Sequence, residues 1–164
     1  MIRMICLMLI ATVVISCTKE NQKITTYYDL ENKSIREVYS VRADSPSIRE
    51  GEYLLYGKDG NLVERRNYLH NQIQDTLFKY YASGKMSEKA LFANGIGNGE
   101  RKVFYESGPV MIIEHYDKGQ FEGTYQTFFE NGHKKESGQY HKNVMTGKWE
   151  YYYDTGELKE EVMF

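Results

Sequence analysis

The side chains best suited to chemistry in this sequence are four histidines and a set of evenly spaced glutamates. No two histidines have the spacing of a metal-binding motif; they are His70, His115, His133 and His141. The glutamates follow a 24-residue period with one place missing and could suggest paired carboxylates; they are Glu64, Glu88, Glu136 and Glu160. A residue that recurs in every unit of a chain usually serves the unit, and Lys79 is expected to face Glu88 across two strands. Because catalysis needs a singular constellation of groups, we expect no catalytic centre, no metal site and no cofactor.

The one thiol with an expected role is Cys17. Residues 1–16 carry Arg3 near their start and then an apolar run, which has the shape of a secretory signal. The stretch Val14-Ile15-Ser16-Cys17 resembles the bacterial lipobox, in which the cysteine is acylated and becomes the mature N-terminus. The alternatives are a plain signal peptide or a short N-terminal anchor. We expect a lipid anchor on Cys17 that holds the protein at the outer membrane of the cell envelope, on its periplasmic or surface side.

The rest of the chain has the composition of an exported, soluble domain. The whole chain of 164 residues is 27% charged and 41% hydrophobic, and its formal net charge is −2. A chain without excess positive charge lacks the field that attracts nucleic acid, so we expect no nucleic-acid partner. Cys6 would leave with the signal peptide, so the mature body would hold no thiol for disulfides or metal.

Residues 51–164 are organised by a repeat of 24 residues. One set of glycines keeps this period without a gap, at Gly60, Gly84, Gly108, Gly132 and Gly156. A second set keeps it with Asp75 in one place, at Gly51, Gly99, Gly123 and Gly147. Aromatic residues keep it twice, at Tyr68, Phe92, Tyr116, Tyr140 and Phe164 and at Tyr56, Tyr80, Phe104, Phe128 and Tyr152.

The repeat predicts an all-β fold, a single-layer antiparallel meander of about a dozen strands that coils and twists. Each of Gly60, Gly84, Gly108, Gly132 and Gly156 ends a two-residue turn, for which the Asn-Gly and Asp-Gly versions indicate type I′. A second turn series lies at His70-Asn71, Asn94-Gly95, Lys118-Gly119 and His141-Lys142-Asn143. With two-residue turns residue i faces residue 119 − i, so Gly51 faces Tyr68 and an aromatic ring can lie across the glycine. The same arithmetic steps adjacent repeats by two residues, which would make the sheet coil.

Side-chain alternation also predicts the two faces of the sheet. One face should carry the second glycine set, Tyr53, Tyr125 and Trp149, together with Tyr81, Tyr105, Phe129 and Tyr153 and with Leu62, Met86, Val110 and Leu158. The other should carry the row Tyr56, Tyr80, Phe104, Phe128 and Tyr152 among polar residues.

The segments before the regular repeats are expected to differ from them. Residues 17–26 are polar and predict a tether. Residues 27–50 predict a degenerate N-terminal repeat that caps the array. Tyr27-Tyr28-Asp29 matches Tyr152-Tyr153-Asp154, and after a two-residue insertion Ile35-Arg36-Glu37 matches Leu158-Lys159-Glu160. Residues 42–47, which include Pro46, predict a loop between this cap and the first regular repeat.

The unit from Gly147 to Glu160 resembles the MORN repeat in its bacterial variant form. The resemblance rests on the order Gly-x-Trp/Tyr, then paired aromatics, then Gly, a hydrophobic residue and Glu. It implies five MORN-like repeats in residues 51–164, with departures at Gly57, Asp75 and Arg101. The family consists mostly of binding and assembly modules, and bacterial members include antitoxins of the YwqK type.

We therefore expect a non-enzymatic envelope lipoprotein that binds a protein partner. The row Tyr56, Tyr80, Phe104, Phe128 and Tyr152 is the candidate binding surface, because a single-layer sheet cannot bury both of its faces. The alternative is an antitoxin or immunity protein that neutralises a toxin. An envelope hydrolase and a carbohydrate or lipid binder are the less favoured classes.

Overall fold

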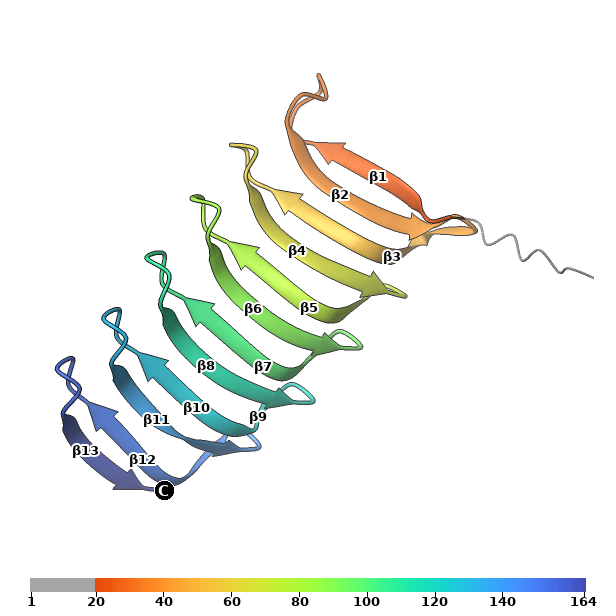
Figure 1. Ribbon diagram of the computed structural model, residues 1–164. Helices are drawn as coiled ribbons and strands as arrows, with labels where there is room; N and C mark the ends of the chain where they lie inside the picture. The colour runs from red at the N-terminus through yellow and green to blue at the C-terminus, as the bar shows by residue number, and fades with distance from the viewer. Residues whose placement is uncertain (1–19) are drawn as a thin grey trace, which may run out of the picture.

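The computed structural model describes residues 20–164, which form one antiparallel sheet without a second layer (Figure 1). Thirteen strands follow one another in chain order, and only the two-residue β9 lies off the main path, paired with β8. The predicted all-β meander is confirmed. No helix long and apolar enough to cross a membrane occurs in the described part.

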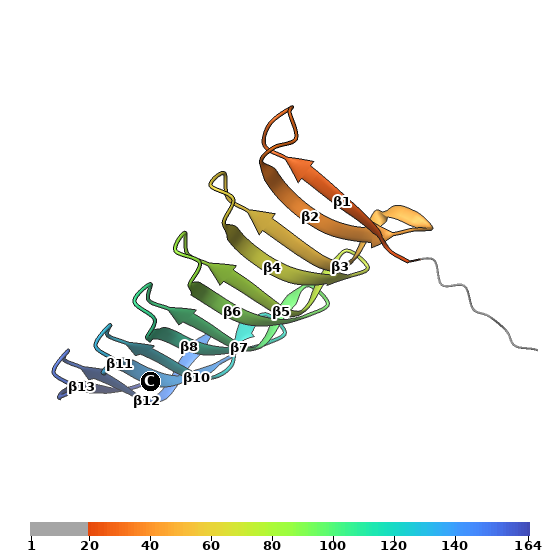
Figure 2. The ribbon, with the colours of Figure 1, turned by 45° about the horizontal axis from the view of Figure 1, so that its top comes forward.

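Most strands are six to nine residues long, whereas β3 has 12 residues and β9 has two. Their bounds are β1 Gln22–Tyr27, β2 Ile35–Arg42, β3 Ser45–Tyr56, β4 Leu62–Leu69, β5 Gln72–Tyr80, β6 Met86–Ala93, β7 Ile96–Phe104, β8 Val110–Asp117, β9 Gln120–Phe121, β10 Gly123–Phe128, β11 Lys134–His141, β12 Val144–Tyr152 and β13 Leu158–Met163. The hairpins stack side by side, bow in the same sense and turn progressively about the stack (Figures 1 and 2).

The second turn series forms two-residue turns as predicted. Both central residues have positive φ, for example 50° and 67° at His70-Asn71 and 52° and 79° at Asn94-Gly95. Two positive φ values define the type I′ turn, which matches the twist of the strands it joins. At the last of these turns the central pair is Lys142-Asn143, with φ of 50° and 68°.

The first turn series differs from the prediction, because its turns contain three residues. At Gly60 the amide of Gly57 donates to Asn61 O at 2.8 Å and the amide of Gly60 donates to Gly57 O at 3.0 Å. Gly60 has a positive φ of 82°, whereas the φ of Asp59 is not positive. This is a type I turn followed by a left-handed glycine bulge. The turns at Gly84, Gly108, Gly132 and Gly156 repeat both hydrogen bonds.

The extra turn residue overturns part of the predicted face assignment. The register slips by one residue beside each of these turns, so that Tyr56 pairs with Leu62 while Leu55 pairs with Glu64. Directly paired residues point to the same side of a sheet. Leu62, Met86, Val110 and Leu158 therefore share a face with the row Tyr56, Tyr80, Phe104, Phe128 and Tyr152, and not with the second glycine set.

The reason for glycine at the positions of the second set also differs from the prediction. The register is correct, with Gly51 opposite Tyr68, Gly99 opposite Tyr116 and Gly123 opposite Tyr140. A Cβ added at Gly123 or Gly147 would meet no atom within 4 Å, so no ring lies across these glycines. They have positive φ, as does Asp75 at 69°.

These left-handed residues lie where one strand carries two extra residues relative to its neighbour. Ala90 pairs with Arg101 and Phe92 with Gly97, so four steps along β7 oppose two along β6, and Gly99 lies between. The bulge absorbs the two-residue step between repeats that was predicted to coil the sheet. Bulges bend strands and increase twist, and because one recurs in every repeat, all hairpins bow alike (Figure 1).

The turn glycines allow a direct test of backbone strain. A Cβ added at Gly84 meets nothing within 4 Å, but the φ there is 80°. Gly84→Ala should therefore lower the free energy of unfolding by about 1–2 kcal/mol, the usual cost of a left-handed non-glycine residue. Gly97→Ala is the matched control, because Gly97 has no positive φ and an added Cβ meets only Tyr116 Cγ at 3.7 Å. Urea unfolding of the two variants measures the difference, and equal losses would contradict the assignment.

The N-terminal segment is more regular than predicted. Residues 22–26, expected to lie in a tether, belong to β1, and the predicted loop at residues 42–47 is a turn at Ala43 and Asp44, with Pro46 inside β3. The cap is a hairpin like the others, with two extra residues in its turn: Tyr28 N donates to Ser34 O, where Tyr153 N donates to Glu157 O. The predicted lipidation site at Cys17 and the predicted signal segment lie outside the described residues.

Candidate functional site

The two faces of the sheet differ in burial. Along β4, Glu64, Arg66 and Tyr68 are half-buried while the residues between them are exposed. Tyr53 is 3% exposed and Trp149 is 1% exposed. In a sheet without a second layer, large side chains are buried only where the sheet curves around them. We call this side the inner face and define it by the central row Tyr53, Leu77, Arg101, Tyr125 and Trp149.

Each residue of the central row is paired with a residue that sets the space available to it. The paired residues, in the same order, are Arg66, Ala90, Glu114, Gly138 and Val162. Gly138 also lies against Trp149, and a Cβ there would come within 2.2 Å of the indole. The indole of Trp149 therefore fits because Gly138 has no side chain.

At the C-terminal end the inner face carries a continuous cluster of rings, defined by Tyr116, Phe121, Tyr125, Tyr140, Trp149 and Phe164. Phe121 stacks against Tyr116 at 4.7 Å between ring centroids and against Tyr140 at 5.1 Å. Trp149 meets Tyr140 edge-on at 5.2 Å. Such pairs add to the stability gained from burial.

At the N-terminal end Arg49 organises a smaller group of rings. Its guanidinium carbon lies 4.8 Å from the centroid of Tyr39 and 5.5 Å from those of Tyr53 and Tyr68. These are cation–π distances. Burial, together with the hydrogen bond that the Tyr53 hydroxyl donates to Glu37, raises the pKa of Tyr53 to about 12, so the phenol stays neutral.

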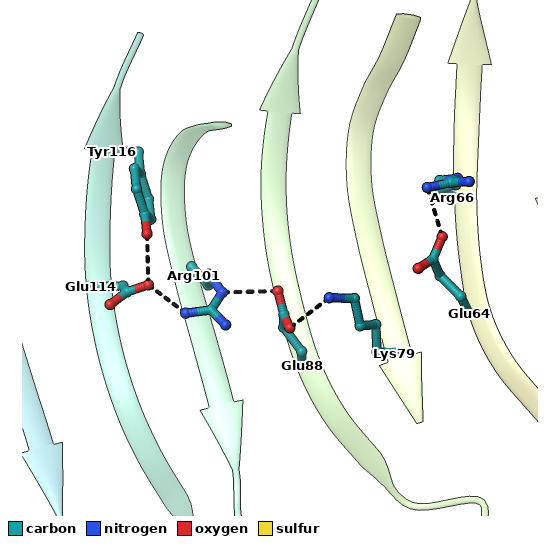
Figure 3. Close-up of polar contacts among 7 residues, drawn as sticks. All are labelled: Glu64, Arg66, Lys79, Glu88, Arg101, Glu114 and Tyr116. Carbon is teal, nitrogen blue, oxygen red and sulfur yellow. Dashed lines mark hydrogen bonds and ion pairs between the residues drawn. The ribbon is translucent and has the colours of Figure 1, made fainter. Parts of the chain in front are cut away.

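Between the two groups of rings the central row changes to Leu77 and Arg101, and a polar network takes the place of the rings (Figure 3). Arg101 donates from Nε to Glu88 at 2.8 Å and from Nη1 to Glu114. Lys79 donates to Glu88 at 3.1 Å, which confirms the predicted cross-strand pair. The Tyr116 hydroxyl donates to Glu114 at 2.9 Å.

The network is electrostatically closed. Two cations, Lys79 and Arg101, face two carboxylates, and Glu114 is 4% exposed. Burial alone would raise the pKa of Glu88, but the hydrogen bonds from Arg101 and Lys79 outweigh it and lower that pKa overall. Burial and the bond to Glu114 raise the pKa of Tyr116 to about 12. These shifts favour an ionised Glu88 and a neutral Tyr116, so the arrangement suits positioning better than proton transfer.

Beside the network lies a hollow of about 280 Å³. It is lined by Glu88, Ala90, Leu91, Phe92, Gly97, Arg101, Tyr116 and Gly119. Its walls therefore come from β6, β7, β8 and the turn after β8.

The side chains singled out in the sequence do not come together into one site. The row Tyr56, Tyr80, Phe104, Phe128 and Tyr152 lies on the other face, beside the three-residue turns, and all five rings are half-buried. His115 and His133 hydrogen-bond backbone carbonyls and His141 bonds Glu122, each in a separate place. Within residues 20–164 no three His, Cys, Asp or Glu side chains are placed to hold a metal ion.

Sequence reasoning did not identify two features. The hydroxyls of Tyr28, Tyr81 and Tyr105 each donate to a carbonyl of the next repeat, at Tyr56, Phe104 and Phe128, and so tie neighbouring hairpins together. The hollow was not foreseen either, although aligning the repeats shows glycine at position 97 where other units carry larger residues.

The lowered pKa of Glu88 predicts a specific pH dependence. Because its folded pKa lies below the ordinary value of 4.5, Glu88 contributes stability that is fully present above that value and is lost as the pH falls through the folded pKa. In Glu88→Gln this contribution is absent, so the stability difference between wild type and variant should be largest near neutrality and shrink in acid. Urea unfolding from pH 7 to pH 3 measures it. Parallel curves for the two proteins would contradict the role of Glu88.

Comparison with known proteins agrees with the repeat. The pattern described as the MORN repeat variant matches residues 49–70, 98–118, 121–142 and 145–164. Residues 71–97, which lie between the first two matched segments, contain Asp75, Leu77 and five of the eight residues that line the hollow. A search of curated proteins found no match. The matched segments cover just over half of the chain, and MORN repeats generally serve in interactions with proteins or membranes. The chain belongs to the MORN repeat variant family.

Proposed function

We propose that this protein is a non-enzymatic binding module, anchored by lipid in the cell envelope, that holds a protein partner against its inner face. The observation that carries the proposal is the single layer of the sheet. The aromatic row of the inner face is half-buried at Tyr68, Phe92, Tyr116 and Tyr140, and no described segment covers it. Rings with a polar edge on an uncovered surface are typical of protein-binding sites.

The anchor would hold the sheet close to the membrane. The first strand begins at Gln22, five residues after Cys17. An extended chain of this length reaches at most roughly 18 Å. The lipid anchor is tested by incorporation of labelled palmitate, which should disappear in Cys17→Ala, and labelling that persists in the variant would rule it out.

The binding face is tested by a matched pair of variants. Phe92→Ser removes a half-buried ring from the inner face, and Phe104→Ser removes a half-buried ring from the predicted binding row on the other face. Both should cost similar stability, which circular dichroism would check. Partners would be crosslinked in intact cells, identified, purified and titrated against each variant.

We expect Phe92→Ser to weaken partner binding at least tenfold and Phe104→Ser to leave it within twofold of wild type. The reverse result would assign binding to the row Tyr56, Tyr80, Phe104, Phe128 and Tyr152. Failure of both variants to change the affinity, or the lack of any specific partner, would contradict the proposal. If the partner proves to be a toxin whose activity is suppressed on coexpression, the binding serves as immunity.

A further inference from the structure

One position of the repeat carries a long side chain in every regular unit except one. The row is Arg49, Ile73, Gly97, Phe121 and Met145. From the second of these onward, each residue pairs with the inner-face aromatic of the preceding hairpin: Tyr68 with Ile73, Phe92 with Gly97, Tyr116 with Phe121 and Tyr140 with Met145. Position 97 is therefore a gap in an otherwise filled row.

The filled members of the row show what the position accommodates. Phe121 lies between two rings, stacked on Tyr116 with an interplanar angle of 30° and on Tyr140 with an angle of 28°. Arg49 lies over Tyr39, Tyr53 and Tyr68. By repeat equivalence, a side chain at position 97 would lie between Phe92 and Tyr116.

The fold does not require glycine at this position. Gly97 has no positive φ, unlike Gly95 at 79° and Gly99 at 109°. A Cβ added at Gly97 would make only ordinary contact, with Tyr116 Cγ at 3.7 Å. A Cβ at Gly99, by contrast, would come within 2.9 Å of Leu91. The consequence of Gly97 is the hollow itself, which is lined by Phe92, Gly97 and Tyr116.

The size and chemistry of the hollow select its occupant. An apolar cavity of about 150 Å³ holds a benzene molecule, and this hollow measures about 280 Å³. Ala90, Leu91, Phe92 and Tyr116 give it apolar walls. Arg101 at its base is already neutralised by Glu88 and Glu114. An entering charge of either sign would lose water without gaining a free counter-ion.

We propose that this hollow receives one aromatic side chain of the protein partner, which takes the place that Phe121 fills in the next repeat. The proposal rests on the proposed function, since it specifies the chemistry of the partner's contact. We call this hollow the socket. It is open at Gly97, whereas the side chain of Phe121 fills the equivalent space in the next repeat.

A small probe tests the socket without the partner. N-acetyl-phenylalanine amide, titrated into isotopically labelled protein, should shift the amide signals of Leu91, Gly97 and Tyr116 in a saturable manner. In Gly97→Phe, which places a ring in the socket, the affinity should fall at least tenfold. N-acetyl-arginine amide should cause no such shifts. Equal shifts in wild type and Gly97→Phe, preferential binding of the arginine probe, or no binding of either probe would overturn the proposal.

The purified partner provides the second test. Gly97→Phe should fold with an unchanged circular dichroism spectrum, and its affinity for the partner should fall at least tenfold. Ile73→Phe, at the equivalent position one repeat earlier, should keep an affinity within twofold of wild type. If the partner binds Gly97→Phe as well as wild type, the socket proposal fails and the proposed function stands. If no partner exists, the proposed function fails, and the probe titration decides on the socket alone.

Discussion

Replacing Trp149 with alanine should lower the free energy of unfolding by about 3–5 kcal/mol, the range for removing a large buried aromatic side chain. Trp149 is 1% exposed, and its indole contacts Tyr125, Tyr140 and Phe164 at centroid distances of 5.7, 5.2 and 6.2 Å. Gly138 leaves the space that the indole fills. Its loss would leave a cavity that the rigid ladder of the sheet cannot close.

Trp149→Phe is the control for this prediction. It keeps a ring in the space and removes an indole N–H that has no hydrogen-bond partner within the described residues. It should therefore cost less than half as much as the alanine variant. Both variants remove the one tryptophan of the chain, so they cannot be followed by tryptophan fluorescence. Unfolding in urea is therefore followed by far-ultraviolet circular dichroism. Similar losses in the two variants would show that the ring does not hold the C-terminal repeats together.

Replacing Arg101 with leucine should cost about 3 kcal/mol at neutral pH, the lower end of the range for breaking a buried ion pair, because the Arg101 side chain is 29% exposed. Glu114, whose side chain is 5% exposed, would keep only the Tyr116 hydroxyl as a partner for its charge. Arg101 also lowers the pKa of Glu88, so the loss should diminish as the pH falls through that lowered pKa.

The double variant Arg101→Tyr with Glu114→Gly separates the charge from the packing. It rebuilds the pair Tyr125 and Gly138 of the following repeat and leaves Glu88 paired with Lys79. Because both members of the pair are removed, stability should return to within about 1 kcal/mol of wild type. Urea unfolding of the three proteins measures the series. A double variant as unstable as Arg101→Leu would show that the network is required for reasons other than charge balance.

The sequence was sufficient to predict the sheet, its order and much of its register, because the 24-residue period places every turn. It was not sufficient to predict the size of the turns. Both Asp59-Gly60 and Asn94-Gly95 fit a type I′ turn by composition, but Gly60 adopts the bulge position of a three-residue turn. One extra turn residue reverses the side-chain alternation. The prediction of two-residue turns therefore placed Leu62 on the wrong face.

The glycines of the second set show a related difficulty. The repeat spacing alone does not distinguish two reasons for glycine at position 51. The glycine could leave room for the ring of Tyr68, which lies opposite, or it could allow a left-handed backbone. Asp75 was the informative exception, because aspartate adopts positive φ more readily than most residues but would not make room for a ring. The bulge that it marks was therefore indicated by the sequence and was read as an imperfect repeat.

The candidate site was only partly predictable. Arg101 was recognised as a departure from the repeat, but its partner Glu114 occupies a position that is alanine or glycine in two neighbouring units, and only the structure brings the two together. Gly97 does not recur with the 24-residue period, so the pattern of repeating glycines does not single it out. A glycine that appears once, in a row of larger residues, is the signal that would have found the hollow.

Apart from the two-residue β9, each strand of the described chain pairs only with the strands before and after it in the chain, and this has a mechanical consequence. Tension applied between the two ends would be carried by one hairpin junction after another, and no junction shields the next. The array should extend in separate steps, each releasing roughly 80 Å for a 24-residue unit. If the protein is anchored by lipid and bound to a partner through its sheet, as proposed, it would lengthen under load before the partner dissociated.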